Sequence, residues 1–261
     1  MAKAKTKKKE GFGELLKTIV YALLIAGVFR TVLFQPFWIP SGSMKPTLLI
    51  GDYLFISKYA YGYSSVSCPT VFGVNLCPFI PGRILASDPE RGDVVVFKHP
   101  RTAEDYIKRL IGLPGDTVQM RGGVLHINGK PVGMARGGVF LDPAFGMCAD
   151  SRIVGDRRYC ALQEWTETLP NGVSHPVLNT ADGMGFDDTV EFRVPEGHFF
   201  FMGDNRDNSV DSRVPQSARG VGMVPFRNLI GRADRVMFSS AGRSIFFVWT
   251  WRGDRFFKAL T

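Results

Sequence analysis

The hydrophobic pattern of the chain opens with one long apolar run, "LLKTIVYALLIAGVFRTVLF", from Leu15 to Phe34. A helix of this length is about 30 Å long, which matches the hydrocarbon core of a bilayer. Lys17 and Arg30 lie near its two ends, where long side chains can reach the membrane interface. The pattern therefore predicts a single N-terminal transmembrane helix.

Beyond this run the apolar positions fall into short segments that are typical of β-strands. These segments are "DYLFISKYAYG", "GDVVVFKHP", "DYIKRLIGLPGD" and "DTVEFRVPEGHFFFMGD", of which the last supplies two strands. "VLHINGKPV" is typical of a hairpin with Asn128 and Gly129 as its two-residue loop. Helical periodicity is weak outside the first run. The expected fold class is therefore mainly β, with an antiparallel β-rich domain after the helix.

Three regions differ from this strand pattern. Residues 64–90 are expected to form a long loop, and residues 131–190, rich in Gly and Asp, an inserted subdomain. The last segment mixes Phe and Trp with Arg and Lys, so it either rests on a membrane surface or packs against the core. The predicted division is a basic tail at 1–13, a transmembrane anchor at 14–35, a core formed by 36–130 and 191–240, the insertion at 131–190, and an aromatic, basic tail at 241–261.

The distribution of charge sets the expected orientation. Formal net charge is +8, and the first ten residues, "MAKAKTKKKE", carry five lysines and one glutamate. A lysine-rich flank keeps that end of a membrane helix in the cytoplasm, so the rest of the chain is expected outside. The alternatives are a buried core helix and a cleavable signal peptide, but no clear small-x-small cleavage site follows the run. The lysine-rich start is not followed by a basic stripe laced with aromatic residues, which argues against a nucleic-acid partner.

The four cysteines lack the paired C-x-x-C spacing of zinc sites. Cys68 and Cys77 lie within one loop-like segment, and Cys148 and Cys160 lie within another. Because disulfides form in exported domains, these two local pairs are the favoured connectivity, with four buried thiols as the alternative. The four histidines, at positions 99, 126, 175 and 198, show no ligand spacing, so neither a metal site nor a cofactor is expected.

Candidate chemistry begins in "IPSGSMKPTL", Ile39–Leu48, where a glycine separates two serines and prolines lie on both sides. A serine hydroxyl becomes a nucleophile only when a base takes its proton, and the usual base is histidine. The chain has no G-x-S-x-G motif and no histidine in a glycine-rich motif. A lysine can replace histidine if burial away from acids keeps the amine neutral.

Three lysines are candidates for this base. Lys45 lies two residues from Ser43, which misses the S-x-x-K spacing that would place both groups on one helix face. Lys58, in "FISKYAYG", is a second candidate. Lys108 lies in a predicted strand, where alternation places it on the same face as Tyr106, and that face can be apolar. The alternative for Lys108 is a lysine whose ammonium reaches the surface.

A third segment, "GDNRDNSVDSR", from Gly203 to Arg213, is the most polar stretch of the chain and follows the very apolar "HFFFM". One interpretation is a loop with local ion pairs and side-chain turns. The other is a polar loop that a buried strand holds in place to orient a catalytic group.

Taken together, "PSGSMKPTLLIGD", "RGDVVVF", "DYIKRLIGLPGD" and "GDNRDNSVDSR", in this order behind an apolar anchor, resemble bacterial signal peptidase I. The resemblance implies a membrane-bound serine endopeptidase with a Ser/Lys dyad. Such an enzyme removes signal peptides from exported preproteins at the outer face of the bacterial cytoplasmic membrane. It implies a single-pass protein with a periplasmic catalytic domain, whose partners are preproteins and the lipid bilayer.

The resemblance also implies a role for individual residues. Ser43 matches the nucleophile and Lys108 the general base. The Ser43 backbone N–H and the Ser41 hydroxyl match the oxyanion hole, and Ser209 matches a serine that orients the lysine. The residues expected to support the site through ion pairs are Asp204, Asp211 and Arg213. The expected walls of shallow pockets for small substrate residues are Ile39, Pro40, Met44, Leu48, Tyr106 and Ile107.

Other functions remain open at this point. A related peptidase could process one dedicated substrate, such as a pilin or a conjugation protein. A membrane-anchored binding module could keep the fold without catalysis, although both Ser43 and Lys108 are present. Self-cleaving repressors use a similar dyad but carry a DNA-binding helix-turn-helix where this chain has its apolar run. The lysine-rich start also lacks the Arg- and Ser-rich character of a mitochondrial targeting segment.

Overall fold

The computed structural model describes residues 11–68, 70–71, 74–75, 77–80, 82–143, 148, 150–180, 183, 185–242 and 245–260. Within these residues it contains one α-helix, α1 (Phe12–Val32), together with nineteen β-strands and seven short 3-10 helices. The strands are β1 (Phe34–Trp38), β2 (Asp52–Ser57), β3 (Tyr63–Ser64), β4 (Thr70–Val71), β5 (Val74–Asn75), β6 (Arg83–Ile84), β7 (Val94–Lys98), β8 (Asp105–Gly112), β9 (Thr117–Arg121), β10 (Val124–Ile127), β11 (Lys130–Pro131), β12 (Gly133–Asp142), β13 (Ser151–Val154), β14 (Arg157–Thr168), β15 (Ser174–Asn179), β16 (Phe192–Arg193), β17 (His198–Met202), β18 (Val224–Pro225) and β19 (Leu229–Ser239). The 3-10 helices are Lys58–Ala60, Ser65–Ser67, Arg206–Asn208, Gln216–Ala218, Phe226–Asn228, Val248–Thr250 and Gly253–Arg255. All pairings between these strands are antiparallel, so the prediction of a mainly antiparallel β fold is confirmed.

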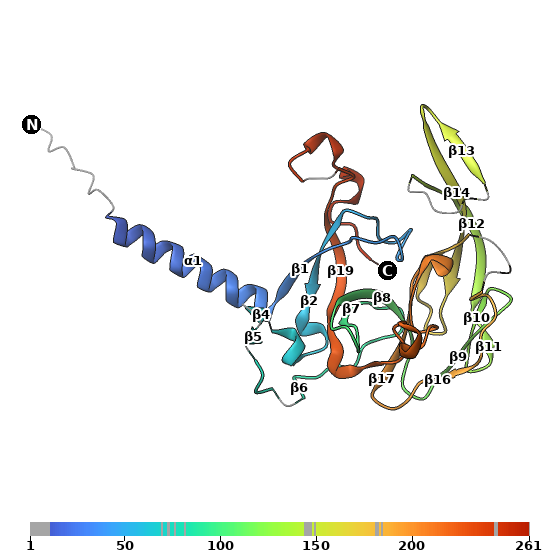
Figure 1. The fold of residues 1–261 in the computed structure, drawn as a ribbon, viewed down its shortest axis with the longest axis horizontal. Coiled ribbons are helices and arrows are strands. Elements are labelled where there is room, and N and C mark those ends of the chain that lie inside the picture. The colour runs from blue at the N-terminus through green and yellow to red at the C-terminus, as the bar shows by residue number, and fades with distance from the viewer. Residues whose placement is uncertain are drawn as a thin grey trace, which may run out of the picture.

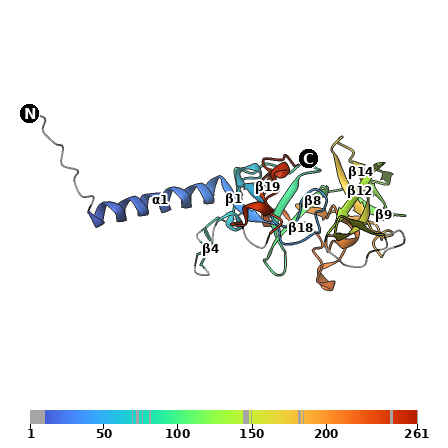
Figure 2. The same ribbon diagram turned by 90° about the horizontal axis from the view of Figure 1, so that it is seen from above.

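The helix α1 projects away from the β-structure and meets it at one end, next to β1 (Figures 1 and 2). At that end the rings of Phe29 and Phe34 are 5.7 Å apart. The large apolar side chains along the helix are exposed, namely Leu15, Leu16, Ile19, Val20, Tyr21, Leu23, Leu24, Ile25, Val28 and Phe29. In the part of the chain that the structure describes, no helix meets both the length and the apolarity that a membrane span requires.

The largest sheet has seven strands in the order β1-β2-β19-β7-β8-β17-β18. The short apolar strand β7 lies in the interior of this sheet. Its side chains alternate between the two faces of the sheet, so they belong to two different layers of the core. Val94 and Val96 belong to one buried cluster, whereas Val95 and Phe97 belong to another. This strand is buried on both faces, which explains why its sequence is continuously apolar instead of alternating.

Two smaller four-stranded sheets lie on the side of the molecule away from α1 (Figure 1). The first has the order β11-β10-β9-β16, and its predicted hairpin turn is confirmed. Asn128 and Gly129 take φ values of 53° and 75°, as a two-residue loop between antiparallel strands requires. The second contains β12, β13, β14 and β15, and it occupies residues whose strands the sequence pattern did not reveal.

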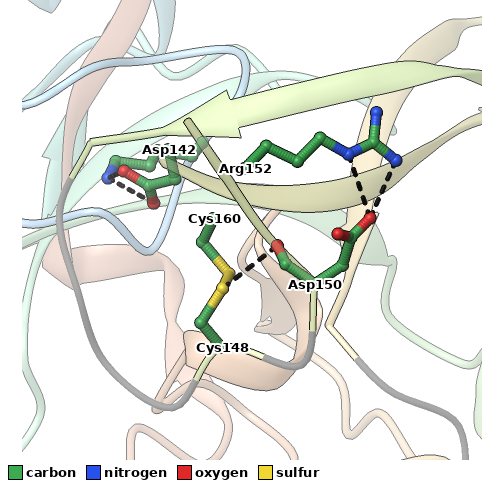
Figure 3. Close-up of a disulfide and its surroundings, with 6 residues drawn as sticks. Asp142, Cys148, Asp150, Arg152 and Cys160 are labelled. Carbon is green, nitrogen blue, oxygen red and sulfur yellow. Dashed lines mark hydrogen bonds and ion pairs between the residues drawn. A yellow bond between two sulfur atoms is a disulfide. The ribbon is translucent and has the colours of Figure 1, made fainter. Parts of the chain in front are cut away.

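Both predicted disulfides are present. Cys68 is bonded to Cys77 and Cys148 to Cys160, with S–S distances of 2.08 and 2.09 Å. The second bond joins β14 to the segment that precedes β13, at the end of the second small sheet (Figure 3). Local pairing within each loop-like segment is therefore correct.

The aromatic tail, described over residues 245–260, packs against the core through some of its side chains, as one of the two interpretations of the sequence expected. Trp251 and Phe256 pack on Phe238 of β19, with ring centroids 4.8 and 5.2 Å away. Arg255 is buried and its guanidinium pairs with the Asp52 carboxylate. Several other side chains of the tail remain exposed, namely Ile245, Phe246, Phe247, Val248, Trp249 and Phe257.

Candidate active site

The serine-rich turn is the closed end of the β1–β2 hairpin. Ile39 continues the ladder beyond β1, since its N–H donates to the Asp52 carbonyl at 2.9 Å and its carbonyl accepts from Gly51 at 3.0 Å. Ile39, Met44 and Leu48 are buried in the same apolar cluster. These three side chains fix both ends of the loop, so that the serines between them are presented at the surface of the sheet.

A cleft of about 310 Å³ opens beside this turn. It lies between the end of β1 and the first residues of β8. The residues that line it are Phe37, Pro40, Ser41, Ser43, Asp105, Tyr106, Ile107, Lys108 and Val210. The structure thus brings together three segments that are far apart in the sequence.

Ser43 and Lys108 meet in the wall of this cleft. The Nζ atom of Lys108 lies 2.5 Å from the Ser43 Oγ atom and 3.1 Å from the Ile107 carbonyl oxygen. Both side chains are largely buried. Strand alternation places Lys108 on the same face as Tyr106, whose ring centroid is 5.8 Å from the lysine nitrogen. A hydroxyl and an amine at this distance can exchange a proton directly.

The surroundings of Lys108 favour its neutral form. Burial lowers the pKa of this lysine from 10.5 to about 8. The carboxylates of Asp211 and Asp204 act in the opposite direction and raise the pKa, while Arg213 lowers it further. Desolvation outweighs the two carboxylates, so the amine is available as a base in mildly alkaline solution.

The two other candidate lysines are placed differently. Lys45 is buried next to the turn, but its Nζ atom lies 2.6 and 2.7 Å from the two carboxylate oxygens of Asp142. Lys58 is buried elsewhere and donates to the carbonyl of Ser67. Neither contacts the Ser43 hydroxyl, so Lys108 is the lysine that the fold brings to the serine.

The polar loop at 203–213 holds the serine turn from one side. The backbone N–H of Asn205 donates to the Ser43 carbonyl, and its side-chain amide donates to the Gly42 carbonyl, both at 3.1 Å. Ser41 and Ser43 are close neighbours, with their hydroxyl oxygens 3.4 Å apart. The hydroxyls of Ser41 and Ser43 therefore lie side by side in the wall of the cleft.

Gly203 allows the loop to approach the turn this closely. A Cβ atom at this position would lie 2.5 Å from the Ser43 carbonyl oxygen and 2.3 Å from the Ser209 hydroxyl. Neither distance leaves room for a methyl group. The sequence alone did not single out this glycine or Asn205, because their importance comes from a contact across 160 residues of chain.

Ser209 lies beside this contact, and its hydroxyl is buried. It has no partner of normal hydrogen-bond geometry among the described residues, although it lies close enough to Asp211 to lower the pKa of that carboxyl. Lys108 instead contacts the Ile107 carbonyl. The structure therefore brings Ser209 to the site without a hydrogen bond to the lysine.

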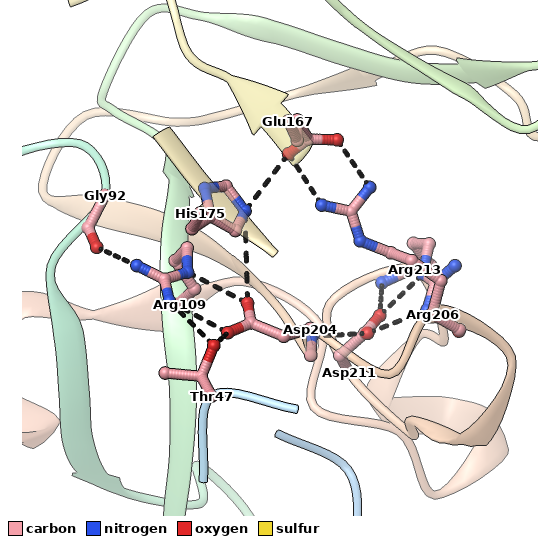
Figure 4. A network of polar contacts seen from close by, with 10 residues as sticks. Thr47, Gly92, Arg109, Glu167, His175, Asp204, Arg206, Asp211 and Arg213 are labelled. Atoms are coloured by element: carbon pink, nitrogen blue, oxygen red, sulfur yellow. Dashed lines mark hydrogen bonds and ion pairs between the residues drawn. The ribbon is translucent and has the colours of Figure 1, made fainter. Parts of the chain in front are cut away.

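A buried network of ion pairs lies behind the dyad (Figure 4). Arg109 donates to both carboxylate oxygens of Asp204 at 2.8 Å, and the Thr47 hydroxyl donates to the same carboxylate. Burial raises the pKa of Asp204, but Arg109 more than offsets this, so the pKa stays below its ordinary value. The carboxylate is therefore charged and holds the base of the serine turn against β8.

The same network reaches the β12–β15 sheet. Glu167 of β14 accepts from Arg206 at 2.6 and 2.7 Å, and His175 of β15 lies 3.3 Å from Glu167. Arg213 pairs with Asp211 and donates to the Arg206 carbonyl. Asp204, Asp211 and Arg213 therefore all take part in ion pairs of this network. The sequence reasoning missed the other members, namely Thr47, Arg109, Glu167, His175 and Arg206.

The predicted substrate walls separate into two groups. Pro40, Tyr106 and Ile107 line the cleft. Ile39, Met44 and Leu48 are instead in the buried cluster beneath the turn. Phe37, Asp105 and Val210 also line the cleft, although the sequence analysis did not name them among its walls. Phe37 belongs to the edge strand β1, and Asp105 is the first residue of β8.

The described residues contain no group of three or more His, Cys, Asp or Glu side chains that could hold a metal ion.

Comparison with known proteins identifies the family of this chain. The family model described as "Signal peptidase, peptidase S26" matches residues 12–238. The chain belongs to this family. The matched residues include the serine turn, Lys108 and the polar loop at 203–213, so the S26 match spans the whole candidate site.

Curated relatives agree with the S26 assignment. The signal peptidase I of Rickettsia typhi is 38% identical over 247 residues, which cover 92% of this chain and 85% of that protein. The signal peptidase I of Rickettsia massiliae is 39% identical over 243 residues, covering 90% of this chain and 81% of that protein. A crystal structure of a signal peptidase I from Enterococcus faecalis is 26% identical and covers 56% of this chain and 97% of its own, with a TM-score of 0.30.

Proposed function

We propose that this S26 family member is a serine endopeptidase that removes signal peptides from exported preproteins, with Ser43 as nucleophile and Lys108 as general base. One observation carries the proposal: a buried lysine contacts a serine hydroxyl at 2.5 Å in the wall of an open cleft. Membership of the peptidase family supplies the reaction class, and the geometry supports the residues.

The proposed reaction begins with neutral Lys108. Its amine takes the Ser43 proton as the serine oxygen attacks the scissile carbonyl, and the Ser43 N–H and Ser41 hydroxyl stabilise the resulting oxyanion. The lysine ammonium then gives its proton to the departing amine, which leaves an acyl-enzyme on Ser43. A water molecule loses its proton to Lys108 and hydrolyses the ester, after which the serine recovers its hydrogen.

The cleft suits an extended peptide. β1 is the edge strand of the seven-stranded sheet. Residues 105–108 of β8 pair with β7 alone, because β17 joins β8 only from Arg109 onward. Two free strand edges therefore face the cleft, and a substrate strand can add to them through backbone hydrogen bonds. The cleft walls Ile107 and Val210 are short apolar side chains, which suits small residues in the substrate.

We further propose that α1 and its flanking residues anchor the enzyme in the bacterial cytoplasmic membrane, with the lysine-rich start inside and the β-structure in the periplasm. Two observations support this. The large apolar side chains along α1 are exposed in the part of the chain that the structure describes, and the first ten residues hold five lysines. The tail adds three exposed aromatic side chains, Phe246, Trp249 and Phe257, of the kind that rest at a lipid interface.

The test is cleavage of a preprotein whose signal ends in Ala-x-Ala, by purified full-length chain in detergent. Ser43→Ala and Lys108→Ala should each abolish cutting while the folded state, followed by circular dichroism, is retained. Lys130→Ala, a change at an exposed lysine, serves as the matched control and should cut normally. Normal cutting by Lys108→Ala would refute the dyad.

The same assay, run on several preproteins, distinguishes general signal-peptide processing from a peptidase with one dedicated substrate. Cleavage of several unrelated preproteins supports general processing of signal peptides. Failure on all of them, with a folded wild-type protein, would contradict the proposed function and favour a peptidase with one dedicated substrate, or a binding module.

A further inference from the structure

A buried ion pair joins the serine turn to the β12–β15 sheet. The Nζ atom of Lys45, two residues after the proposed nucleophile, lies 2.6 Å from Oδ1 and 2.7 Å from Oδ2 of Asp142. Both side chains are more than nine-tenths buried, at 7% and 9% exposure. Figure 3 shows the Asp142 carboxylate near the Cys148–Cys160 disulfide. The proposed dyad does not use this pair.

Lys45 lies directly against Gly42, the glycine between the two serines of the turn. Its backbone N–H donates to the Gly42 carbonyl at 3.1 Å. Its side chain then folds back, so that a Cβ atom on Gly42 would lie 3.1 Å from the Lys45 Cε atom and 3.4 Å from its Nζ atom. The aliphatic stem of Lys45 therefore packs over Gly42, the residue whose backbone conformation sets the direction of both Ser41 and Ser43.

Asp142 is restrained by the sheet to which it belongs. It is the last residue of β12 and pairs across the sheet with Cys160 of β14. Cys160 is in turn bonded to Cys148. The carboxylate is therefore attached to a strand end that a backbone ladder and a covalent bond both restrain, so it forms a fixed point for the lysine.

We propose that Lys45 and Asp142 are a positioning pair, through which the β12–β15 sheet holds the nucleophile turn in its reactive geometry. The proposal rests on the assignment of Ser43 as nucleophile. Asn205 holds the carbonyls of Gly42 and Ser43 from the polar loop, while the ion pair holds the turn from the end of β12. With either restraint missing, Gly42 can rotate, and the Ser43 hydroxyl spends less time at Lys108.

The first experiment measures kcat and KM for preprotein cleavage by full-length variants. Lys45→Met and Asp142→Asn should lower kcat by about 10- to 100-fold with KM changed less than about threefold, because the substrate cleft contains neither side chain. Lys45→Arg keeps the ion pair and should recover most of the loss. Asp150→Asn, which breaks the exposed pair with Arg152 in the same sheet region, is the matched control and should leave kcat unchanged.

A double variant separates positioning from folding. Each single change leaves one buried charge without a partner, which destabilises a protein by itself. Lys45→Met with Asp142→Leu removes both charges, so the fold should recover its thermal stability while kcat stays low. Wild-type kcat in this double variant would overturn the proposal.

The pH dependence of kcat distinguishes positioning by Lys45 from direct proton transfer. In Lys45→Met the height of the profile should fall while the midpoint of its acidic limb remains that of the wild type. A shifted or missing limb would overturn the positioning role and make Lys45 part of the proton transfer. Ser43→Ala, measured alongside, tests the proposed function separately: if that variant still cuts, the nucleophile assignment fails regardless of the Lys45 result.

Discussion

At the scale of single residues, the partner of each buried lysine decides what the amine can do. Lys45 contacts a carboxylate, whereas Nζ of Lys108 contacts the Ser43 hydroxyl and a backbone carbonyl. The network behind the dyad is already balanced, with Arg109, Arg206 and Arg213 against Asp204, Glu167 and Asp211. Burial is the main cause of the lowered pKa of Lys108, because Asp211 and Asp204 raise this pKa and only Arg213 adds to its lowering.

This gives a prediction for the pH dependence of cleavage. The pKa of Lys108 is lowered to about 8, so the amine is protonated and inactive below that pH and neutral above it. We expect kcat to rise about tenfold per pH unit up to pH 8 and then level off. The measurement is kcat between about pH 6 and 10. A midpoint near 10.5, the ordinary lysine value, would contradict burial as the cause.

A second prediction concerns Gly203. Gly203→Ala places a methyl group 2.5 Å from the Ser43 carbonyl oxygen, so the loop and the turn must separate. We expect kcat to fall at least about tenfold and the free energy of unfolding to fall by about 1–3 kcal/mol, as overpacking usually costs. Gly138→Ala is the control, since a Cβ atom there meets nothing within 4 Å. Equal effects of the two changes would refute the role of close approach.

At the scale of elements, the cleft arises where strand pairing stops. β1 ends the sheet, and β17 leaves the first four residues of β8 unpaired on one side. The β1–β2 hairpin loop then supplies the nucleophile between these edges. The β12–β15 sheet contacts the same loop through Asp142, and the Cys148–Cys160 bond closes the strand end that carries this residue.

The two disulfides should therefore differ in their effect on catalysis. Cys148→Ser with Cys160→Ser opens a loop with a sequence separation of 12, and Cys68→Ser with Cys77→Ser opens one of 9. Both changes should cost about 3 kcal/mol of unfolding free energy in urea titrations. Only the first should also lower kcat, because only that disulfide lies beside Asp142. Equal kcat in both variants would argue against this coupling.

Sequence pattern recovered the elements whose signal is local. The Asn128–Gly129 hairpin, the buried run of β7 and the two disulfides each depend on residues that are close in sequence, and all were predicted correctly. Strands β12 to β15 were missed because their exposed positions and glycines weaken alternation. The division of the chain into segments and the individual catalytic roles stay predictions.

The candidate site divides in the same way. Family motifs pointed to Ser43 and Lys108, and the fold brings them into contact. Arg206, Glu167 and Gly203 could not be found, because each matters through a partner that lies tens of residues away or more in the sequence. The pocket walls were expected from residues near the serine, but three of those point into the core and help fix the turn instead.

At the scale of the whole molecule, one ion network joins three parts of the fold. Arg109 of β8 binds Asp204 in the polar loop, which contacts Thr47 below the serine turn. His175 and Glu167 extend the network into the β12–β15 sheet (Figure 4). The charges of this interior are paired, so its stability depends on every member being present.

Asp204→Asn tests this dependence. The change leaves the fully buried Arg109 guanidinium without its carboxylate, and we expect a loss of about 3–5 kcal/mol in unfolding free energy. Chemical denaturation gives the measurement. Asp150→Asn, at an exposed pair, should cost less than about 1 kcal/mol. A loss below 1 kcal/mol for Asp204→Asn as well would show that the interior tolerates the unpaired charge.

The distance in sequence between the parts of the site also governs when the enzyme becomes active during its own biogenesis. Ser43 leaves the ribosome early, yet its turn closes only against residues 203–211, and β2 gains its second neighbour only from β19. Contacts of such long range form late, after most of the chain has been made. We therefore expect peptidase activity to begin only when the polar loop has docked against the serine turn.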